Sequence, residues 1–144
     1  MSRTYPASLP CLCANLRRAS RALTQRYDQA LRRLDITITQ FTILQALSLT
    51  GVVSQGRLAE ILAMDSTTLT RTLAIMSKHG WILSEPGPDR RERRLSLSPA
   101  GRRKFQAVLP HWQRTQAQLR ARLGPDRWND LMNAINHVAL AVTD

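Results

Sequence analysis

The sequence is short of acidic residues. It holds 10 aspartates and glutamates against 21 lysines and arginines, so the formal net charge is +11 and the pI is about 11.4. Every cationic residue except Lys78 and Lys104 is an arginine. The arginine guanidinium binds phosphate and guanine through two parallel hydrogen bonds and also enters minor grooves. This bias favours a nucleic-acid partner over a surface that is charged only for solubility.

Long apolar runs are missing as well. No segment reaches the length that spans a bilayer, the N-terminus lacks the apolar core of a signal peptide, and we find no lipidation motif. The only cysteines are Cys11 and Cys13, which do not make a disulfide framework. We therefore expect a cytoplasmic protein with no membrane partner.

Residue patterns typical of an enzyme are also absent. His79, His111 and His137 show no ligand spacing with each other or with acids, and serine, histidine and aspartate are too scattered to suggest a nucleophile. No glycine-rich phosphate loop is present. We expect no catalytic residue, no cofactor and no metal site.

The apolar pattern predicts a mainly α (α+β) fold in one domain, residues 1–144. Helical spacing indicates six helices, at about 9–34, 38–51, 55–63, 66–79, 99–123 and 126–142. Alternation predicts two strands at 81–84 and 94–97, whereas 52–53 is too short for more than an edge strand. Capping residues support these boundaries. They are Thr37 with Gln40, Ser54, Asp65 or Ser66, Gly80, and Ser98 with Pro99.

The segment 65–80 is the centre of the chain. As a helix it places Leu69, Leu73 and Met76 on one side. The opposite side is polar and cationic, and it carries Thr67, Thr68, Thr70, Arg71, Ala74 and Lys78. Hydroxyls and a cation can contact phosphates and base edges, and short side chains allow a close approach. An ordinary solvated helix face is the alternative. Together with the helix at 55–63 it makes a helix-turn-helix, whose second helix can lie in the major groove.

The hairpin tip, residues 85–93, is rich in arginine, proline and glycine. Its cations could insert into a minor groove beside the major groove that holds the helix. The alternative is a solvated hairpin whose aspartate, glutamate and arginine side chains pair with each other.

This order of elements resembles the MarR family of bacterial winged-helix regulators. The similarity is strongest in residues 38–44, 57–62, 66–82 and 89–101, and only the helix pattern agrees at the two ends. It implies a winged helix-turn-helix lobe at 36–100 and dimerisation helices at 9–34 and 101–142. It further implies an obligate homodimer, associated with the bacterial nucleoid, that binds a pseudo-palindromic operator and usually represses. An architectural DNA-binding protein without an effector is the alternative function.

The resemblance also implies DNA-binding roles by position. Thr67, Thr68, Thr70 and Arg71 would face the major groove, and Ser66 would lie near phosphate. Arg91 would enter the minor groove from the hairpin tip, with Asp89 orienting the loop. Arg90, Arg93 and Arg94 add local positive charge, as Lys78 does at the end of the helix.

Family members often release DNA when a small molecule enters a cleft beside the dimerisation helices, and others respond to thiol oxidation or metal. Such a cleft would here involve Tyr27, Phe41, Trp112, Arg17 and Arg21. Plain packing in the core and at the interface is the alternative for each aromatic residue.

Cys11 and Cys13 are a second candidate for sensing. Near the start of a helix, and among arginines, a thiolate at Cys11 is favoured and would be open to oxidation or to a soft electrophile or metal. Residues two apart on a helix point in nearly opposite directions, so the pair cannot hold one ion as helix members. It could do so only if the segment were extended or if the partner subunit supplied ligands. An intersubunit disulfide, or burial of both cysteines at the dimer interface, remains an alternative.

Overall fold

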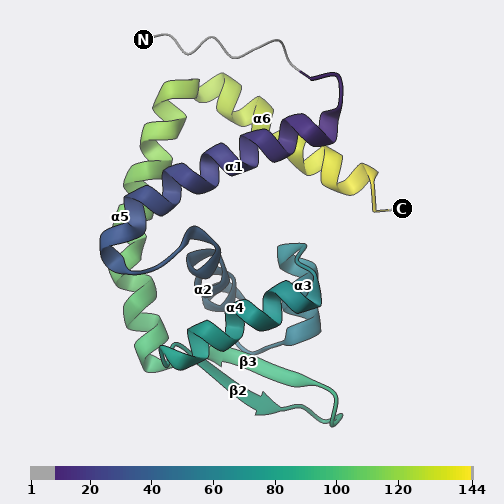
Figure 1. The fold of residues 1–144 in the computed structure, drawn as a ribbon, viewed down its shortest axis with the longest axis vertical. Helices are drawn as coiled ribbons and strands as arrows, with labels where there is room; N and C mark the ends of the chain where they lie inside the picture. The colour runs from purple at the N-terminus through teal and green to yellow at the C-terminus, as the bar shows by residue number, and fades with distance from the viewer. Residues whose placement is uncertain (1–8, 144) are drawn as a thin grey trace.

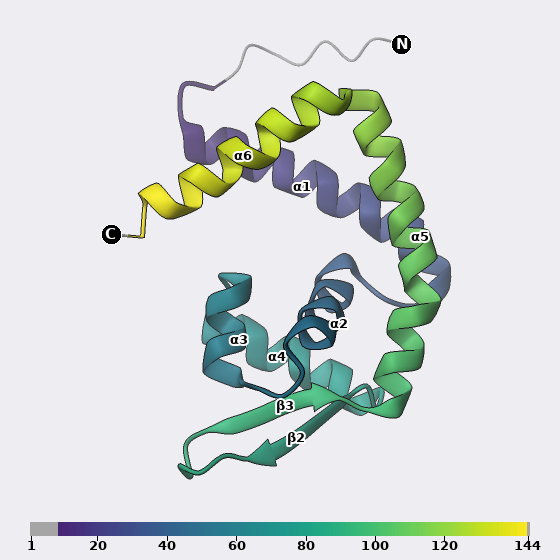
Figure 2. The ribbon, with the colours of Figure 1, turned by 180° about the vertical axis from the view of Figure 1, so that it is seen from behind.

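The computed structural model describes residues 9–143, and these form six α-helices, one 3₁₀ helix and a three-stranded sheet. The elements are α1 (Leu12–Leu31), η1 (Arg32–Leu34), α2 (Ile38–Thr50), β1 (Val53–Ser54), α3 (Gln55–Leu62), α4 (Ser66–Lys78), β2 (Ile82–Pro86), β3 (Arg93–Leu97), α5 (Pro99–Leu123) and α6 (Pro125–Ala141). Figures 1 and 2 show two parts joined by α5. One part contains α1 and α6, and the other contains α2, α3, α4 and the strands. The predicted mainly helical, winged helix-turn-helix fold is confirmed.

Capping residues begin the helices at the predicted places. Thr37 and Gln40 form a reciprocal capping box at the start of α2. Ser54 accepts a hydrogen bond from the Arg57 amide at the start of α3, and Ser98 accepts one from the Gly101 amide at the start of α5. Each bond satisfies an amide that has no partner within its helix.

The first helix is shorter than predicted. It begins at Leu12 instead of residue 9, because Cys11 is extended and acts as the N-cap. Its α-helical part ends at Leu31, and the chain continues as the 3₁₀ turn η1 up to Asp35, which adopts a left-handed φ of 53°. Apolar periodicity continues through a 3₁₀ turn, so it does not mark this boundary.

The sheet has three strands instead of the predicted two. Its order is β1-β3-β2, with all pairs antiparallel. Residues Val53 and Ser54 pair with Leu95 and Arg94, so the short edge strand forms and widens the hairpin. Trp81 precedes β2 and is buried, whereas Ile82 lies opposite Leu97 at the base of the hairpin.

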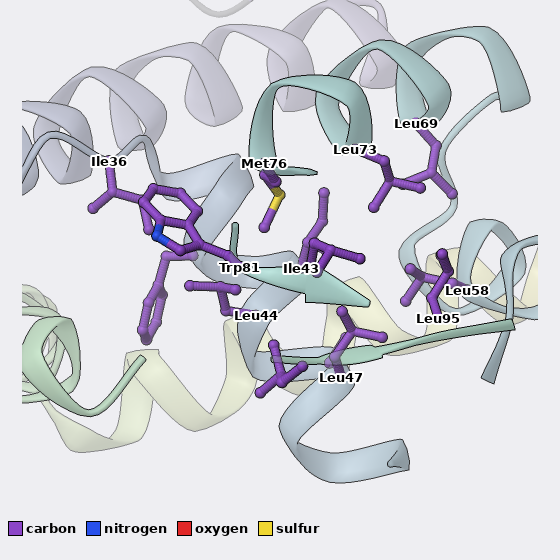
Figure 3. Packing of buried hydrophobic residues seen from close by; sticks show 14 of the residues in the cluster. Ile36, Ile43, Leu44, Leu47, Leu58, Leu69, Leu73, Met76, Trp81 and Leu95 are labelled. Atoms are coloured by element: carbon purple, nitrogen blue, oxygen red, sulfur yellow. The ribbon is translucent and has the colours of Figure 1, made fainter. Parts of the chain in front are cut away.

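The core lies between α4, α2, α3 and the sheet. Figure 3 shows Leu69, Leu73 and Met76 pointing from α4 toward Ile43 of α2 and the neighbouring core residues, as the sequence predicts. All three are buried, and Leu69 and Met76 have no exposed surface. Because this side of α4 is anchored in the core, its opposite side is held outward.

The part formed by α1 and α6 is much less buried in the single chain. Within the described residues α6 has no buried side chain and α1 has only Leu31. Large apolar side chains are exposed on both helices and at the end of α5: Leu12, Leu16, Leu23, Leu123, Leu131, Met132, Ile135 and Leu140. We call these residues the open apolar surface. Between residues 9 and 143, no helix combines the length and the apolarity that crossing a membrane requires.

Candidate nucleic-acid interface

The start of α4 is fixed by a double contact between Asp65 and Thr68. One oxygen of the Asp65 carboxylate accepts a hydrogen bond from the Thr68 amide at 2.9 Å, and the other accepts one from the Thr68 hydroxyl at 2.6 Å. These bonds favour the charged carboxylate and lower the pKa of Asp65, the hydroxyl bond contributing most. The first turn of the helix therefore has a defined geometry.

The outward side of α4 carries the predicted set of residues. Ser66, Thr67, Thr68, Thr70, Arg71, Ala74 and Lys78 are all exposed. Two of the hydroxyls are already bound within the protein. Thr68 donates to Asp65, and Thr70 donates to the Ser66 carbonyl at 2.7 Å. Sequence reasoning placed these hydroxyls toward phosphates and bases, but it gave no indication of these local bonds.

Gln55, which the sequence did not single out, links the two helices of the helix-turn-helix. Its Nε2 donates a hydrogen bond of 3.0 Å to Oγ1 of Thr70. Gln55 is the first residue of α3, directly after the cap Ser54. Spacing along one helix carries no signal for a contact between two helices, so only the fold reveals it.

The wing, defined here as residues 82–97, has an ordered tip. The Gly87 amide donates to the Glu92 carbonyl at 2.8 Å, and the Glu92 amide donates to the Asp89 carbonyl at 2.9 Å. The Asp89 carboxylate accepts a hydrogen bond from the Arg91 amide at 3.2 Å. An aspartate that binds the backbone two residues on is a common turn-forming device. It fixes the backbone from which the Arg91 side chain extends.

The described wing arginines form no direct ion pairs with the acids of the wing, although Glu85 lies opposite Arg94 in the sheet. Among the described residues, Arg90, Arg91, Arg93 and Arg94 form no ion pair with Glu85, Asp89 or Glu92. The sequence left open a hairpin whose aspartate, glutamate and arginine side chains pair with each other. The described residues of the wing contain no such pair. Arg93 instead donates from Nε to the Ser84 hydroxyl at 3.0 Å, which holds it across β2.

One hollow brings the wing tip and the helix-turn-helix together. It has a volume of about 620 Å³. Its lining comes from the start of α3, the start of α4 and the wing: Ser54, Gln55, Gly56, Ala59, Ser66, Leu69, Asp89, Arg91, Glu92 and Arg93. Four of the predicted DNA-binding residues, Ser66, Asp89, Arg91 and Arg93, thus surround one concave surface. The lining also holds the carboxylates of Asp89 and Glu92, and Asp89 is bound to the Arg91 amide. Backbone amides at two helix starts and the two guanidinium groups are the parts of this surface that suit an anionic backbone.

The predicted effector residues fall in different surroundings. Phe41 is fully buried, its ring stacked on Phe105 at 5.5 Å and 5.7 Å from Trp112, so in the single chain it has the core position that we weighed as the alternative. The Tyr27 hydroxyl bonds to Gln116, and partial burial raises the pKa of Tyr27.

Arg17 and Arg21 are exposed on α1. An effector cleft formed by these residues, Tyr27 and Trp112 stays a prediction.

Cys11 and Cys13 lie at the start of α1 and both are exposed in the single chain. Cys11 is the N-cap and Cys13 belongs to the first turn, while Pro10 precedes the cap. Burial of the pair, the alternative considered from the sequence, would need a second chain.

Comparisons with known proteins agree with this geometry. Residues 36–92 match the model of the MarR family. The multiple antibiotic resistance protein MarR of Salmonella typhimurium is 34% identical over 84 residues, which are 55% of this chain and 58% of that protein.

Two solved structures are similar over nearly the whole chain. The transcriptional regulator MosR of M. tuberculosis, determined in complex with DNA, is 36% identical and covers 93% of this chain and 99% of its own, with a TM-score of 0.80. A probable transcriptional regulator from Pseudomonas aeruginosa is 27% identical, with coverage of 90% and 97% and a TM-score of 0.80.

Proposed function

Because this chain belongs to the MarR family of transcriptional regulators, we propose that it is a homodimeric repressor that binds a pseudo-palindromic DNA operator. One observation carries this proposal: Arg91 and Arg93 of the wing and the starts of α3 and α4 surround a single hollow, and neither arginine forms an ion pair within the described residues. Exposed cations that converge beside a helix suited to the major groove are what a duplex requires.

The proposed binding mode follows from the placement of each element. The outward side of α4 enters the major groove, with Arg71 at base edges and Lys78 near phosphate. Ser66 lies at the helix start, where free amides bind phosphate. The wing reaches the adjacent minor groove through Arg91. Asp89 orients the backbone at Arg91 through the hydrogen bond that its carboxylate accepts from the Arg91 amide. Arg90 and Arg93 contact the flanking phosphates.

The open apolar surface supports the proposed dimer. Leu131, Ile135 and Leu140 of α6 are 42%, 44% and 71% exposed, and Leu12 of α1 is 62% exposed. A patch of this kind calls for a partner surface. A twofold arrangement of residues 9–34 and 101–142 would cover it and leave the lobe of residues 36–100 free to bind DNA. Two copies of α4 would then reach successive major grooves about 34 Å apart.

Selection of bound fragments from genomic DNA, followed by footprinting, tests the function. We expect protection of a discrete palindrome whose halves are separated by about one helical turn. An architectural protein would instead protect DNA broadly, without a preferred sequence. Broad protection would therefore overturn the proposal.

We further propose that release from the operator follows modification of Cys11 or Cys13, or binding of a small molecule. The support is positional, because both thiols are exposed at the start of α1 and close in sequence to the open apolar surface. Peroxide should release the wild-type protein from its operator, whereas the Cys11→Ser, Cys13→Ser double variant should stay bound. Equal release of both proteins would end the thiol proposal and leave the small-molecule proposal to a screen of ligands.

A further inference from the structure

The hydroxyls of Thr68 and Thr70 on α4 are committed to hydrogen bonds within the protein. The Thr70 hydroxyl gives its hydrogen to the Ser66 carbonyl at 2.7 Å and accepts a hydrogen bond from Gln55 at 3.0 Å. The Thr68 hydroxyl gives its hydrogen to the Asp65 carboxylate. A threonine hydroxyl has one hydrogen. Neither group can therefore donate to a phosphate, or to the N7, O6 and O4 acceptors of the major groove, while these bonds last.

The inward hydrogen bond of a threonine hydroxyl determines where the methyl group of the same side chain lies. The threonine β-carbon carries one hydroxyl and one methyl group, and their positions are coupled through a single torsion angle. At Thr70 the hydroxyl lies against the carbonyl one turn earlier, as back-bonded helical threonines do. Because Thr70 is exposed, the group that remains for an incoming duplex is the methyl.

A second methyl group lies on the same side of the helix. Ala74 follows Thr70 by four residues, so the two side chains are neighbours along α4, and Ala74 is exposed. Arg71 lies beside them. At Thr70 and Ala74 the surface that α4 presents is therefore a pair of methyl groups next to a guanidinium, whereas Thr67 keeps an exposed hydroxyl.

We propose that this surface reads thymine by its C5-methyl group. The Thr70 and Ala74 methyls contact thymine methyls in the major groove, and Arg71 binds an adjacent guanine at O6 and N7, the pairings that these groups favour. Gln55 is a positioning residue, since it holds the Thr70 hydroxyl in the inward orientation. The inference rests on the proposed function and adds the base chemistry of the half-site: thymine next to guanine.

Two variants of Thr70 separate methyl from hydroxyl. Thr70→Ser keeps the bonds to Ser66 and Gln55 and removes the methyl. Thr70→Val keeps a methyl in a side chain of the same shape and removes the hydroxyl. Each is measured for affinity on the selected operator and on a copy in which deoxyuridine replaces each half-site thymine in turn. Circular dichroism and the oligomeric state show whether each variant remains folded.

If the methyl is read, deoxyuridine at one position in each half-site should weaken wild-type binding about fourfold per lost contact. Thr70→Val should bind the thymine operator within about twofold of wild type and keep its sensitivity to deoxyuridine. Thr70→Ser removes the methyl, so its affinity for the thymine operator should fall about fourfold per lost contact. Its affinity should also change less than that of wild type when deoxyuridine replaces thymine.

The opposite pattern, with Thr70→Ser intact and Thr70→Val weakened, would overturn the inference while the discrete operator stands. If no operator is selected at all, the proposed function fails first, and the inference fails with it.

Discussion

At the scale of single residues, Asp65 controls the start of the helix that we place in the major groove. The hydrogen bonds from Thr68 lower the pKa of Asp65 in the folded protein. A carboxyl whose folded pKa is depressed stabilises the fold above its ordinary pKa, and this contribution is lost as the pH falls through the depressed value. The α4 cap should therefore weaken only in acid, as the pH falls below the ordinary pKa of aspartate and through the lowered pKa of Asp65.

Substitution of Asp65 tests this cap. Asp65→Ala should lower the thermal midpoint by a few degrees at neutral pH, because an N-cap acceptor is lost. Asp65→Asn keeps an acceptor without a titrating charge, so it should melt close to wild type at neutral pH and lose less stability on acidification. Melting curves from neutral to acidic pH compare the three proteins. If Asp65→Asn and wild type lose stability in parallel, the carboxylate does not have this role.

Contacts within one helical turn could be predicted from the sequence, whereas contacts between helices could not. The capping box of Thr37 and Gln40 was predictable because both partners lie within one turn. The bond between Gln55 and Thr70 was not, because it joins two helices whose relative placement depends on the core beneath them. The threonines lie on the exposed side of α4, but the hydroxyl hydrogens of Thr68 and Thr70 are already used inside the protein.

At the scale of elements, the exit of α4 packs directly against the start of α5. The Ser98 amide donates to the Trp81 carbonyl at 3.0 Å, and the Ser98 hydroxyl donates to the Gly80 carbonyl. Gly101 is buried, and a β-carbon placed there would lie 2.1 Å from the Trp81 carbonyl oxygen. The requirement for glycine comes from this close approach of two backbones. The sequence places Gly101 in a helix but gives no sign of the contact.

We therefore predict opposite effects for two glycine substitutions. Gly101→Ala should destabilise the protein by about 1–3 kcal/mol, because backbone must move to admit the methyl group. Gly56→Ala on α3 should stabilise it by up to about 1 kcal/mol, because nothing lies within 4 Å of the new carbon and alanine favours the helix. Urea unfolding at one fixed protein concentration measures both. A Gly101→Ala protein as stable as wild type would show that the two backbones are not locked together.

At the scale of the whole molecule, a small junction connects η1 and α5 to the exit of α4. Lys104 of α5 donates to the Leu34 carbonyl, and its Nζ lies 5.2 Å from the centre of the Trp81 ring. His79, at the end of α4, stacks on the same ring at 4.4 Å. Displacement of η1 or of α5 would thus move the residues that pack against the end of the proposed recognition helix. Sequence patterns predicted the two parts of the chain, but these contacts arise only when the parts fold against each other.

Charge acts over the whole molecule through the salt dependence of binding. If each subunit of a dimer contacts about four phosphates, log affinity should fall with log salt concentration at a slope of about −7. Arg91→Ala removes one cation per subunit from the wing and should make the slope shallower by up to about 2. Arg114 is an exposed arginine on α5 outside the hollow. Arg114→Ala removes the same charge and should leave the slope unchanged.

Titrations of a fluorescent operator at several salt concentrations give the three slopes. A wild-type slope near half the expected value would mean that one lobe binds alone, and equal changes in both variants would mean that net charge, not the wing, determines affinity.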